Sequence, residues 1–261
     1  MAAVTVEKRK VASGCVAWIT VERPEKLNSL NSDMIAKLTA AAAGLLDDPE
    51  PRAVVLTGAG ERAFIGGADV AEMAALDTRN AARLIIGLHG AAAALRALPI
   101  PVIARIRGFC LGGGMEMAAA CDIRVASDDA TFGMPEVTLG LPSVIEAAIF
   151  PRLIGEGRAN WLLLTGDTLD ARKACEWGFV SEVAPAAKLD AAVENVLAAI
   201  VRNGPAAMRA QKELMRRWDA LPLEEAILSS VPDFVHAYNV GEPQRMMKAF
   251  LQRKKKRKKK G

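Results

Sequence analysis

Hydrophobic and polar positions near the start of this 261-residue chain repeat first with the period of a strand and then with that of a helix. Apolar and polar side chains alternate in Val4–Lys10 and in Val16–Glu22, which predicts two strands. In Leu30–Leu46 the apolar residues follow helical spacing, and Asn31 or Ser32 is a suitable N-cap. The chain therefore opens with a predicted strand pair followed by a helix.

Short apolar runs and longer helical patterns alternate along the rest of the chain. Short apolar runs bounded by Gly or Pro are typical of buried strands. The predicted strands are 53–58, 101–106 and 122–126, and the predicted helices are 79–98, 187–202, 205–218 and 223–237. Strands that alternate with helices and are followed by a helical end predict an α/β core with a C-terminal helical segment.

Basic side chains are concentrated at the C-terminal end. The formal net charge is +4, from 34 Lys and Arg against 30 Asp and Glu, but eight of the basic residues lie within 253–261. The remaining chain is slightly acidic, which argues against a nucleic-acid-binding domain. A run of like charges is typical of a solvated tail that could contact RNA, anionic lipid or a phosphorylated ligand. We therefore predict a core at 1–190, a helical segment at 191–252 and a basic disordered tail at 253–261.

The spacing of the cysteines and the lengths of the apolar runs indicate the cellular compartment in which the protein is expected. Cys15, Cys110, Cys121 and Cys175 form no CxxC pair, and the chain has only two histidines, so neither a zinc site nor a disulfide framework is predicted. We find no apolar stretch of about 18 residues, so no membrane span is expected. Residues 1–12 have no apolar centre, which argues against a secretory signal. The reducing cytoplasm is the expected compartment.

Two glycine-rich segments follow predicted strands. Gly66 and Gly67 precede Asp69, which is placed to cap a helix running through Met73. Gly112–Gly114 precede a helical run, where free N–H groups and the positive end of the helix dipole favour an anion. The second segment matches neither a GxGxxG nor a P-loop pattern, and the first alone is also typical of an ordinary strand-to-helix loop.

Two glutamates lie in apolar surroundings beside these turns. Glu116 falls in the first turn of an apolar helix, and Glu136 follows Pro135 among apolar residues. Each could be an ordinary helix or surface acid, but an apolar setting raises the pKa of a carboxyl group toward neutral pH. Two N–H-rich turns and two glutamates together suggest an oxyanion hole with an acid/base pair. Nucleophilic catalysis is poorly supported, because His89 and His236 have no evident partner motif.

These residues resemble the crotonase, or enoyl-CoA hydratase/isomerase, superfamily from about Val16 to Arg253. The matching segments are 23–30, 63–70, 108–116, 120–126, 132–136, 164–166 and 174–183. The resemblance implies an α/β fold, a crotonase-like spiral of ββα units in two near-perpendicular sheets, with C-terminal helices that form homotrimers, often paired into hexamers. It also implies an acyl-CoA substrate, with coenzyme A as part of that substrate and no separate cofactor.

The resemblance also assigns roles to particular residues. It implies catalytic Glu116 and Glu136 and oxyanion N–H groups at Ala68 and Gly113. The implied coenzyme A contacts are Lys26, Leu27, Ala68, Asp69, Val70 and Ala71. Because both motif glutamates are present, the expected reaction is addition of water across the 2,3 double bond of an enoyl-CoA. The alternatives are an isomerase that uses one glutamate and a non-catalytic, RNA-binding relative whose basic tail is the functional element.

The chain departs from the family pattern at two places. The family commonly has a Pro-Gly-x-Gly-Gly turn after the second glutamate, whereas this chain reads Pro142-Ser143-Val144-Ile145-Glu146. Bulky residues thus replace small ones near the acyl pocket. Ala71 stands where many hydratases carry a basic residue near the phosphates of coenzyme A, so these contacts must come from elsewhere, for example from the basic C-terminal residues.

Glu146 has two interpretations from the sequence. A helix that begins near Ser143 would place Glu146 at the spacing of a capping box, with its carboxylate reaching back to the Ser143 N–H. Alternatively, Glu146 stands beside the pocket as a third acid that contacts water or a polar acyl group. The sequence leaves both interpretations open.

Overall fold

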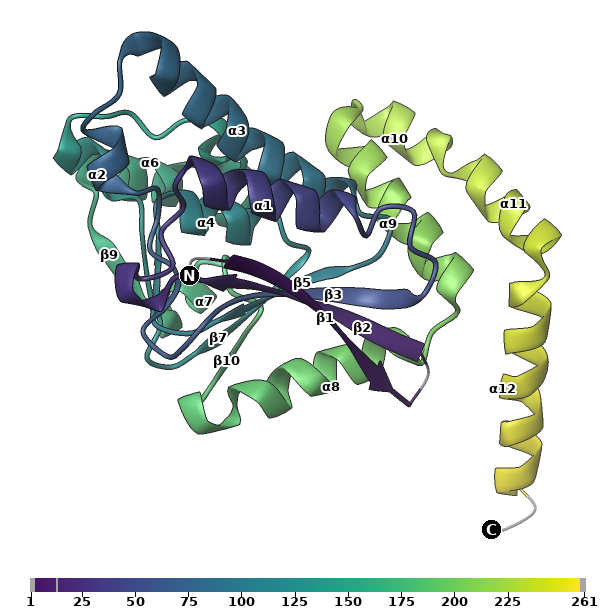
Figure 1. Ribbon diagram of the computed structural model, residues 1–261. Coiled ribbons are helices and arrows are strands. Elements are labelled where there is room, and N and C mark those ends of the chain that lie inside the picture. Colours follow the sequence, from purple (N-terminus) through teal and green to yellow (C-terminus); the bar gives the residue numbers. More distant parts are fainter. Residues whose placement is uncertain (1–2, 13, 259–261) are drawn as a thin grey trace. The chain divides into compact units, whose positions relative to one another are not determined.

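A computed structural model describes residues 3–12 and 14–258 (Figure 1). The chain divides into two compact units, Met1–Ala198 and Ala199–Gly261. A compact unit is not the same as an independently folding domain, so the domain boundary expected at residue 190 stays a prediction.

A six-stranded sheet forms the centre of the first unit. Its strand order is β1-β2-β3-β5-β7-β10. β1 and β2 are antiparallel, and the other neighbours in the sheet are parallel. The strands are β1 (Ala3–Val11), β2 (Gly14–Glu22), β3 (Pro51–Gly58), β5 (Val102–Ile106), β7 (Ile123–Ser127) and β10 (Glu182–Ala184). The strands predicted from the early alternation and from the short apolar runs are confirmed to within two residues.

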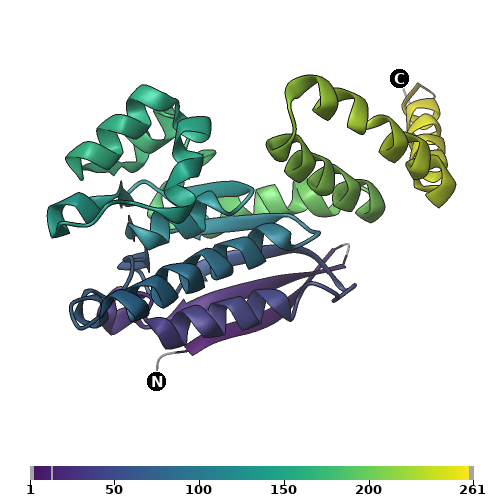
Figure 2. The same cartoon turned by 90° about the horizontal axis from the view of Figure 1, so that it is seen from above.

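Helices cover both faces of this sheet. α1 (Ser32–Ala43) and α3 (Thr78–Ala97) lie side by side on one face, and α8 (Leu189–Val201) lies on the other (Figures 1 and 2). The Asn31 side chain caps α1 by accepting from the Met34 N–H at 2.9 Å, as one of the two predicted caps. These faces bury the apolar stripes that the helical spacing predicted.

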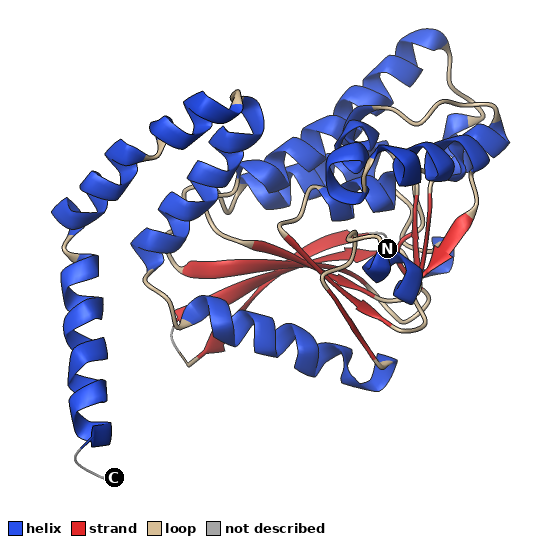
Figure 3. Cartoon of the chain, turned by 180° about the vertical axis from the view of Figure 1, so that it is seen from behind, coloured by secondary structure: helices blue, strands red, loops and turns tan. Residues whose placement is uncertain are grey.

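A second, smaller sheet brings the glycine-rich segments together. Its strands are β4 (Ala63–Ile65), β6 (Phe109–Leu111), β8 (Thr131–Gly133) and β9 (Thr168–Asp170), in that order. Its strands run in a different direction from those of the large sheet (Figure 3). β4, β6 and β8 are parallel, so their carboxyl ends lie at one edge of the sheet. The chain segments that follow these three strands therefore meet at that edge.

Short helical elements complete the first unit. They are η1 (Pro24–Lys26), α2 (Val70–Met73), α4 (Gly113–Ala119), η2 (Pro135–Leu139), η3 (Ile145–Ile149), α5 (Phe150–Ile154), α6 (Glu156–Thr165), α7 (Ala171–Glu176) and η4 (Ala186–Lys188). α2, α4 and η2 follow β4, β6 and β8 respectively. Each of these strand-to-helix turns therefore presents a helix start at the same edge of the small sheet.

The second unit is helical. It contains α9 (Pro205–Ala220), α10 (Leu223–Ser229), α11 (Val231–Val240) and α12 (Glu242–Lys258). The helix predicted over 223–237 is divided at Ser230, because Pro232 provides no N–H for a continuous helix but is favoured in a first turn. The buried Glu242 carboxylate accepts from the Ala206 and Ala207 N–H groups at 3.3 and 2.8 Å and so caps α9.

The basic end of the chain differs from its expected conformation. The backbone of residues 253–258 continues α12, where disorder was expected from Arg253 onward. Lys and Arg are good helix formers, and cations are favoured at the C-terminal end of a helix by its dipole. Residues 259–261 lie outside the described part of the chain. Within that part, no helix is long and apolar enough to cross a membrane.

Candidate active site

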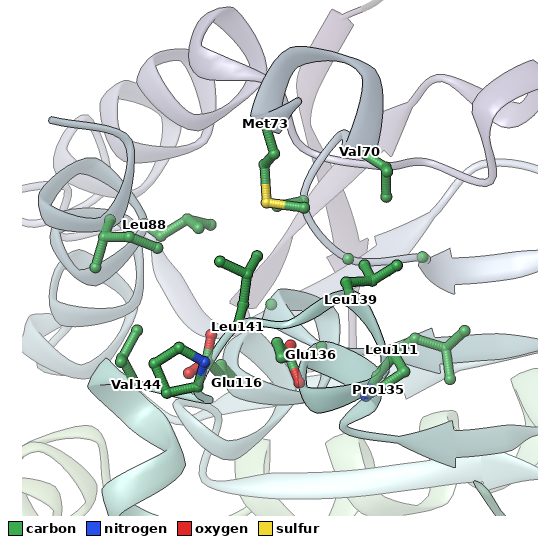
Figure 4. Close-up of a pocket in the computed structure, with 17 residues that line it drawn as sticks. Val70, Met73, Leu88, Leu111, Glu116, Pro135, Glu136, Leu139, Leu141 and Val144 are labelled. Carbon is green, nitrogen blue, oxygen red and sulfur yellow. The ribbon is translucent and has the colours of Figure 1, made fainter. Parts of the chain in front are cut away.

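A cavity of about 220 Å³ opens at the edge of the small sheet where its parallel strands end (Figure 4). Most of its lining is apolar, and Glu116 and Glu136 carry the two ionisable side chains in that lining. The lining residues are Gly66, Gly67, Ala68, Val70, Met73, Ile85, Leu88, Leu111, Gly112, Gly113, Glu116, Pro135, Glu136, Leu139, Leu141, Pro142 and Val144. A mainly apolar cavity with a few convergent polar groups is the usual form of a small-molecule site.

The backbone of Ala68 lies beside that of Gly113 in this cavity. A Cβ placed on Gly113 would be 3.7 Å from the Ala68 nitrogen. Ala68 forms an isolated parallel bridge with Leu30, in which the bonded N–H groups belong to Leu30 and Asp69. The Ala68 and Gly113 N–H groups have no acceptor within residues 3–12 and 14–258. Two free, adjacent donors are the geometry of an oxyanion hole.

Glycine is required at two positions that shape this turn. Gly112 has φ +50° and ψ −122°, a backbone conformation that side chains rarely allow. A Cβ on Gly114 would lie 2.0 Å from the Ile65 carbonyl oxygen, so only glycine lets α4 approach β4 this closely. The close approach places the start of α4 against the Gly66-Gly67 turn and brings the two free donors together.

Arg23 and Asp69 tie the N-terminal loop to the Gly66-Gly67 turn. Arg23 Nη1 lies 2.6 Å from Asp69 Oδ2, with both side chains largely buried. The Arg23 guanidinium lowers the pKa of the Asp69 carboxyl. The same carboxylate accepts from the Ala71 and Glu72 N–H groups, so Asp69 caps α2 as its position predicted.

The predicted coenzyme A residues border the cavity unevenly. Val70 and Ala68 line it, whereas Asp69 and Ala71 lie just outside its lining. Lys26 and Leu27 belong to the loop around η1, where the Leu27 carbonyl oxygen accepts from the Gly66 N–H at 2.8 Å. This hydrogen bond places the η1 loop next to the turn that carries Ala68.

Glu116 is held deep in the site by a backbone donor. It lies in the first turn of α4 and is 4% exposed. Its Oε1 accepts from the Ala147 N–H of η3 at 3.1 Å, and its Oε2 would lie 3.9 Å from a Cβ on Gly113. Burial and then the nearby Glu136 carboxylate raise the pKa of Glu116 to about 8. Glu116 therefore holds a proton at neutral pH beside the free donors.

Glu136 approaches the same place from the other side. It lies in η2 and is half-buried. Its Oε2 accepts from the Ser143 hydroxyl at 2.9 Å, and its Oε1 would lie 2.5 Å from a Cβ on Gly112. Figure 4 shows both carboxyl groups on one side of the pocket, across from Met73 and Val70. The structure thus brings together two glutamates that are twenty residues apart in sequence.

Glu146 does not cap a helix, contrary to one of its two interpretations. The local helix is η3, which begins at Ile145 and has no side-chain cap. Ser143 donates to Glu136 instead. The Glu146 carboxyl is 3% exposed and its Oε1 lies 2.9 Å from Nδ1 of His89. This partner of His89 is not evident from the sequence, because the two residues lie on elements that are remote in sequence.

The α2 and α3 side of the cavity was missed from sequence. Met73, Ile85 and Leu88 form this apolar wall. In sequence they follow the pattern of ordinary core positions of a helix, and nothing in that pattern separates a core position from one that faces a cavity. Within the described residues, no cluster of His, Cys, Asp and Glu is arranged to hold a metal ion.

Comparison with known proteins places this site in a family. The family model for enoyl-CoA hydratase/isomerase proteins matches residues 12–260. The chain belongs to the enoyl-CoA hydratase/isomerase family. A short-chain-enoyl-CoA hydratase of Clostridium acetobutylicum is 35% identical to it over 243 residues, which cover 93% of each chain. A crotonyl-CoA hydratase of Syntrophomonas wolfei is 32% identical over 241 residues, which cover 92% of this chain and 93% of the relative.

Solved structures of the family have the same fold. The crystal structure of an enoyl-CoA hydratase from Bacillus anthracis has a TM-score of 0.90 with this chain at 30% identity, and the match covers 96% of each chain. The α/β fold class expected from the resemblance is therefore confirmed. The assignment of site residues within this family member rests on the geometry described above.

Proposed function

We propose that this chain is an enoyl-CoA hydratase, which adds water across the 2,3 double bond of an acyl-CoA thioester. The observation that carries the proposal is the position of Glu116 and Glu136. Both carboxyl groups reach one apolar cavity beside two free N–H donors. Relatives named as hydratases across more than nine-tenths of this chain support the same reaction.

The Ala68 and Gly113 N–H groups would bind the thioester carbonyl oxygen. When water adds at C3, the electrons of the double bond move toward this oxygen and give a thioester enolate. Preorganised donors in a site that excludes water stabilise such a developing charge strongly. Gly113 is also the first residue of α4, whose dipole places partial positive charge at the same point.

The glutamate pair would move the two protons of the reaction. The carboxylate takes a proton from water as its oxygen bonds to C3, and the protonated carboxyl gives its proton to C2. The pair thus ends with one proton, as it began, and the net change is addition of one water molecule. A carboxyl pair in which one member holds a proton near neutral pH suits this task. In the free protein Glu116 is that member, with its pKa of about 8.

The η1 loop and the start of α2 would bind coenzyme A, which belongs to the substrate, and no separate cofactor takes part. Lys26, Leu27 and residues 68–71 form this edge. The apolar lining opposite, with Leu88, Met73 and Val144, suits an apolar acyl chain. Exposed Lys26 supplies a cation on this side, where position 71 has none.

The second unit would provide subunit contacts in a cytoplasmic homotrimer, either single or paired into a hexamer. Large apolar side chains are exposed along α10–α12, namely Leu223, Ile227, Leu228, Val231, Phe234, Val235, Phe250 and Leu251. A group of exposed apolar side chains is typical of a protein interface. The four cysteines are free thiols, which suits a reducing compartment. Light scattering on the purified protein measures the oligomeric state.

An absorbance assay with crotonyl-CoA tests the reaction. Hydration removes the conjugated enoyl-thioester absorbance, and the product is identified as 3-hydroxybutyryl-CoA by mass. An isomerase would leave crotonyl-CoA unchanged and would create the conjugated absorbance from a 3-enoyl-CoA. Absence of turnover on every enoyl-CoA, together with salt-sensitive RNA binding that is lost on deletion of 253–261, would support the non-catalytic alternative instead.

A further inference from the structure

Glu146 and His89 form a pair directly behind the candidate site. His89 lies on α3 one residue after Leu88, which lines the cavity, and its side chain is 56% exposed. Glu146 lies on η3 and is almost fully buried. Its Oε1 lies at hydrogen-bond distance, 2.9 Å, from His89 Nδ1, so the pair joins α3 to η3. Glu146 itself is absent from the cavity lining, which argues against direct contact with the acyl group.

The same short element holds Glu116. Ala147, the residue after Glu146, donates its N–H to Glu116 Oε1 at 3.1 Å. The position of η3 therefore decides where this donor lies. Glu116 Oε1 is fixed by the donor, and Oε2 remains directed toward Gly113 and the cavity. The contact between His89 and Glu146 thus lies one residue from the bond that orients Glu116.

Two local costs accompany this arrangement. Ile145 has φ +44°, which is an unfavourable conformation for a β-branched residue. Glu146 Oε2 is buried and has no hydrogen-bond partner among residues 3–12 and 14–258. An unsatisfied buried polar atom and a strained φ each destabilise the folded state. Costs of this kind concentrate at functional sites rather than in ordinary packing.

We propose that Glu146, held by His89, is a positioning residue for Glu116. The pair fixes η3 against α3, so that the Ala147 N–H holds one oxygen of Glu116 and leaves the other facing the substrate. The inference rests on the proposed hydratase function, because it assigns Glu116 to proton transfer. The inference also explains why this chain has Val144, Ile145 and Glu146 where the family commonly has small residues.

The charged groups around Glu116 come from three elements. They are Glu136 on η2, Glu146 on η3 and, through Glu146, His89 on α3. The negative charges of Glu136 and Glu146 both raise the pKa of Glu116. Replacing Glu146 by glutamine removes one of these charges but keeps an oxygen that can accept from His89. Replacing it by alanine removes the charge and the contact together.

Steady-state kinetics on crotonyl-CoA over a pH series separate these effects. Glu146→Ala is expected to lower kcat by about 10- to 100-fold with little change in KM, because a misplacement of about 1 Å costs up to about 10²-fold. Glu146→Gln is expected to restore most of kcat, and the limb of the pH profile that reports loss of the Glu116 proton should move to lower pH. Unchanged kcat in Glu146→Ala, or an equal loss in Glu146→Gln, overturns the proposal.

Two further variants guard against a simple folding defect. His89→Ala removes only an exposed ring, so the fold should persist while kcat falls as in Glu146→Ala. Normal kcat in a folded His89→Ala enzyme also overturns the proposal. Glu156→Gln is the matched control, because it removes the same charge from an exposed position in the first turn of α6. It should leave both kcat and the pH profile unchanged.

A measurement without turnover separates failure of this inference from failure of the proposed function. The chain has only two histidines, so ¹⁵N-histidine spectra of wild type and of a His236→Asn variant assign His89. When its ring is neutral, His89 should carry its proton on Nδ1, because that nitrogen donates to Glu146, and Glu146→Ala should abolish this preference. If His89 carries its proton on Nδ1 but the protein hydrates no enoyl-CoA, the proposed hydratase function is refuted and the His89–Glu146 contact stands. If the protein hydrates enoyl-CoA but His89 shows no such tautomer preference, the His89–Glu146 contact is refuted.

Discussion

Glu116 and Glu136 face one cavity from surroundings of opposite kind. Glu116 is buried in the first turn of α4 and is held by a backbone N–H, and its pKa is raised to about 8. Glu136 is half-buried in η2 and is held by the Ser143 hydroxyl. The same side chain is therefore placed once where burial favours the neutral form of the carboxyl group, and once in a half-buried position where a side-chain hydroxyl holds it. In the proposed reaction, this difference in burial suits one glutamate to hold a proton and the other to take one.

The two glutamates also differ in the kind of donor that holds them: a backbone N–H holds Glu116, and a side-chain hydroxyl holds Glu136. The donor to Glu116 belongs to η3, so it can move only if η3 moves. The donor to Glu136 can be deleted by changing one side chain. The two glutamates should therefore respond to different substitutions.

The largest expected effect comes from neutralising either carboxyl group. Glu116→Gln and Glu136→Gln should each lower kcat for hydration by roughly 10²- to 10⁴-fold with little loss of coenzyme A affinity, because general acid/base catalysis contributes about that much. Stopped-flow absorbance and binding of an unreactive acyl-CoA measure the two quantities. Near-normal hydration by Glu136→Gln would remove the hydratase assignment and leave an isomerase or another reaction.

Filling the proposed oxyanion hole beside Glu116 should cost somewhat less. A Cβ on Gly113 would make only ordinary contacts of 3.6–3.9 Å, so Gly113→Val should fold, but its methyl groups would occupy the proposed oxyanion hole. Loss of one oxyanion donor costs about 10²- to 10³-fold in kcat. Gly157→Val is the matched control, because Gly157 is a helical glycine whose added Cβ would meet no neighbouring atom within 4 Å among the described residues. An active Gly113→Val enzyme with normal circular dichroism would show that the hole lies elsewhere.

Sequence patterns predicted the large sheet of this fold much better than the small one. β3 and β5 are continuous apolar runs, and α1 has a cap and a helical stripe, so local rules are enough for them. β4, β6, β8 and β9 have three residues each, which is too short for any periodicity. Their existence depends on pairing between distant segments. The family resemblance implied a second sheet that the residue pattern alone did not reveal.

The residues of the candidate site also fall into those that local sequence signals predict and those that depend on contacts between distant segments. The glycine turns and both glutamates were found from sequence, because unusual glycine content and acids in apolar segments are local signals. The Glu146–His89 contact joins residues 57 positions apart, and the expected capping box was wrong because η3 starts two residues later than the sequence suggested. Ile145 at φ +44° explains this, since no local rule expects a β-branched residue in that conformation.

A smaller, measurable effect should appear in stability. Glu116 has a raised pKa in the folded protein, so the folded state keeps a proton that the unfolded chain releases above about pH 4.5. The contribution of Glu116 to the free energy of unfolding is therefore fully present below about pH 4.5. It falls as the pH rises toward about 8, by at most about 1.4 kcal/mol per pH unit. Urea unfolding of wild type and Glu116→Gln between pH 5 and 8 measures it.

Glutamine stays neutral, so Glu116→Gln should lose less stability than wild type over this range although it is inactive. Glu136→Gln serves as the comparison, because Glu136 is only half-buried. If wild type and Glu116→Gln have the same pH dependence of unfolding free energy, Glu116 is not the proton-holding member of the pair.

The smallest expected effect tests the side-chain support of Glu136. Ser143→Ala deletes the hydroxyl that donates to Glu136 Oε2 at 2.9 Å and leaves the η3 backbone that supports Glu116 in place. A hydrogen bond to a charged group contributes about 1.5–3 kcal/mol, and partial exposure brings this site to the lower end, so kcat should fall by about tenfold. Ser143→Thr keeps a hydroxyl at the same carbon and should retain most of the activity. If Ser143→Ala and Ser143→Thr are equally active, Glu136 is positioned by η2 alone, and the two carboxyl groups are held in the same way, by backbone, rather than in contrasting ways.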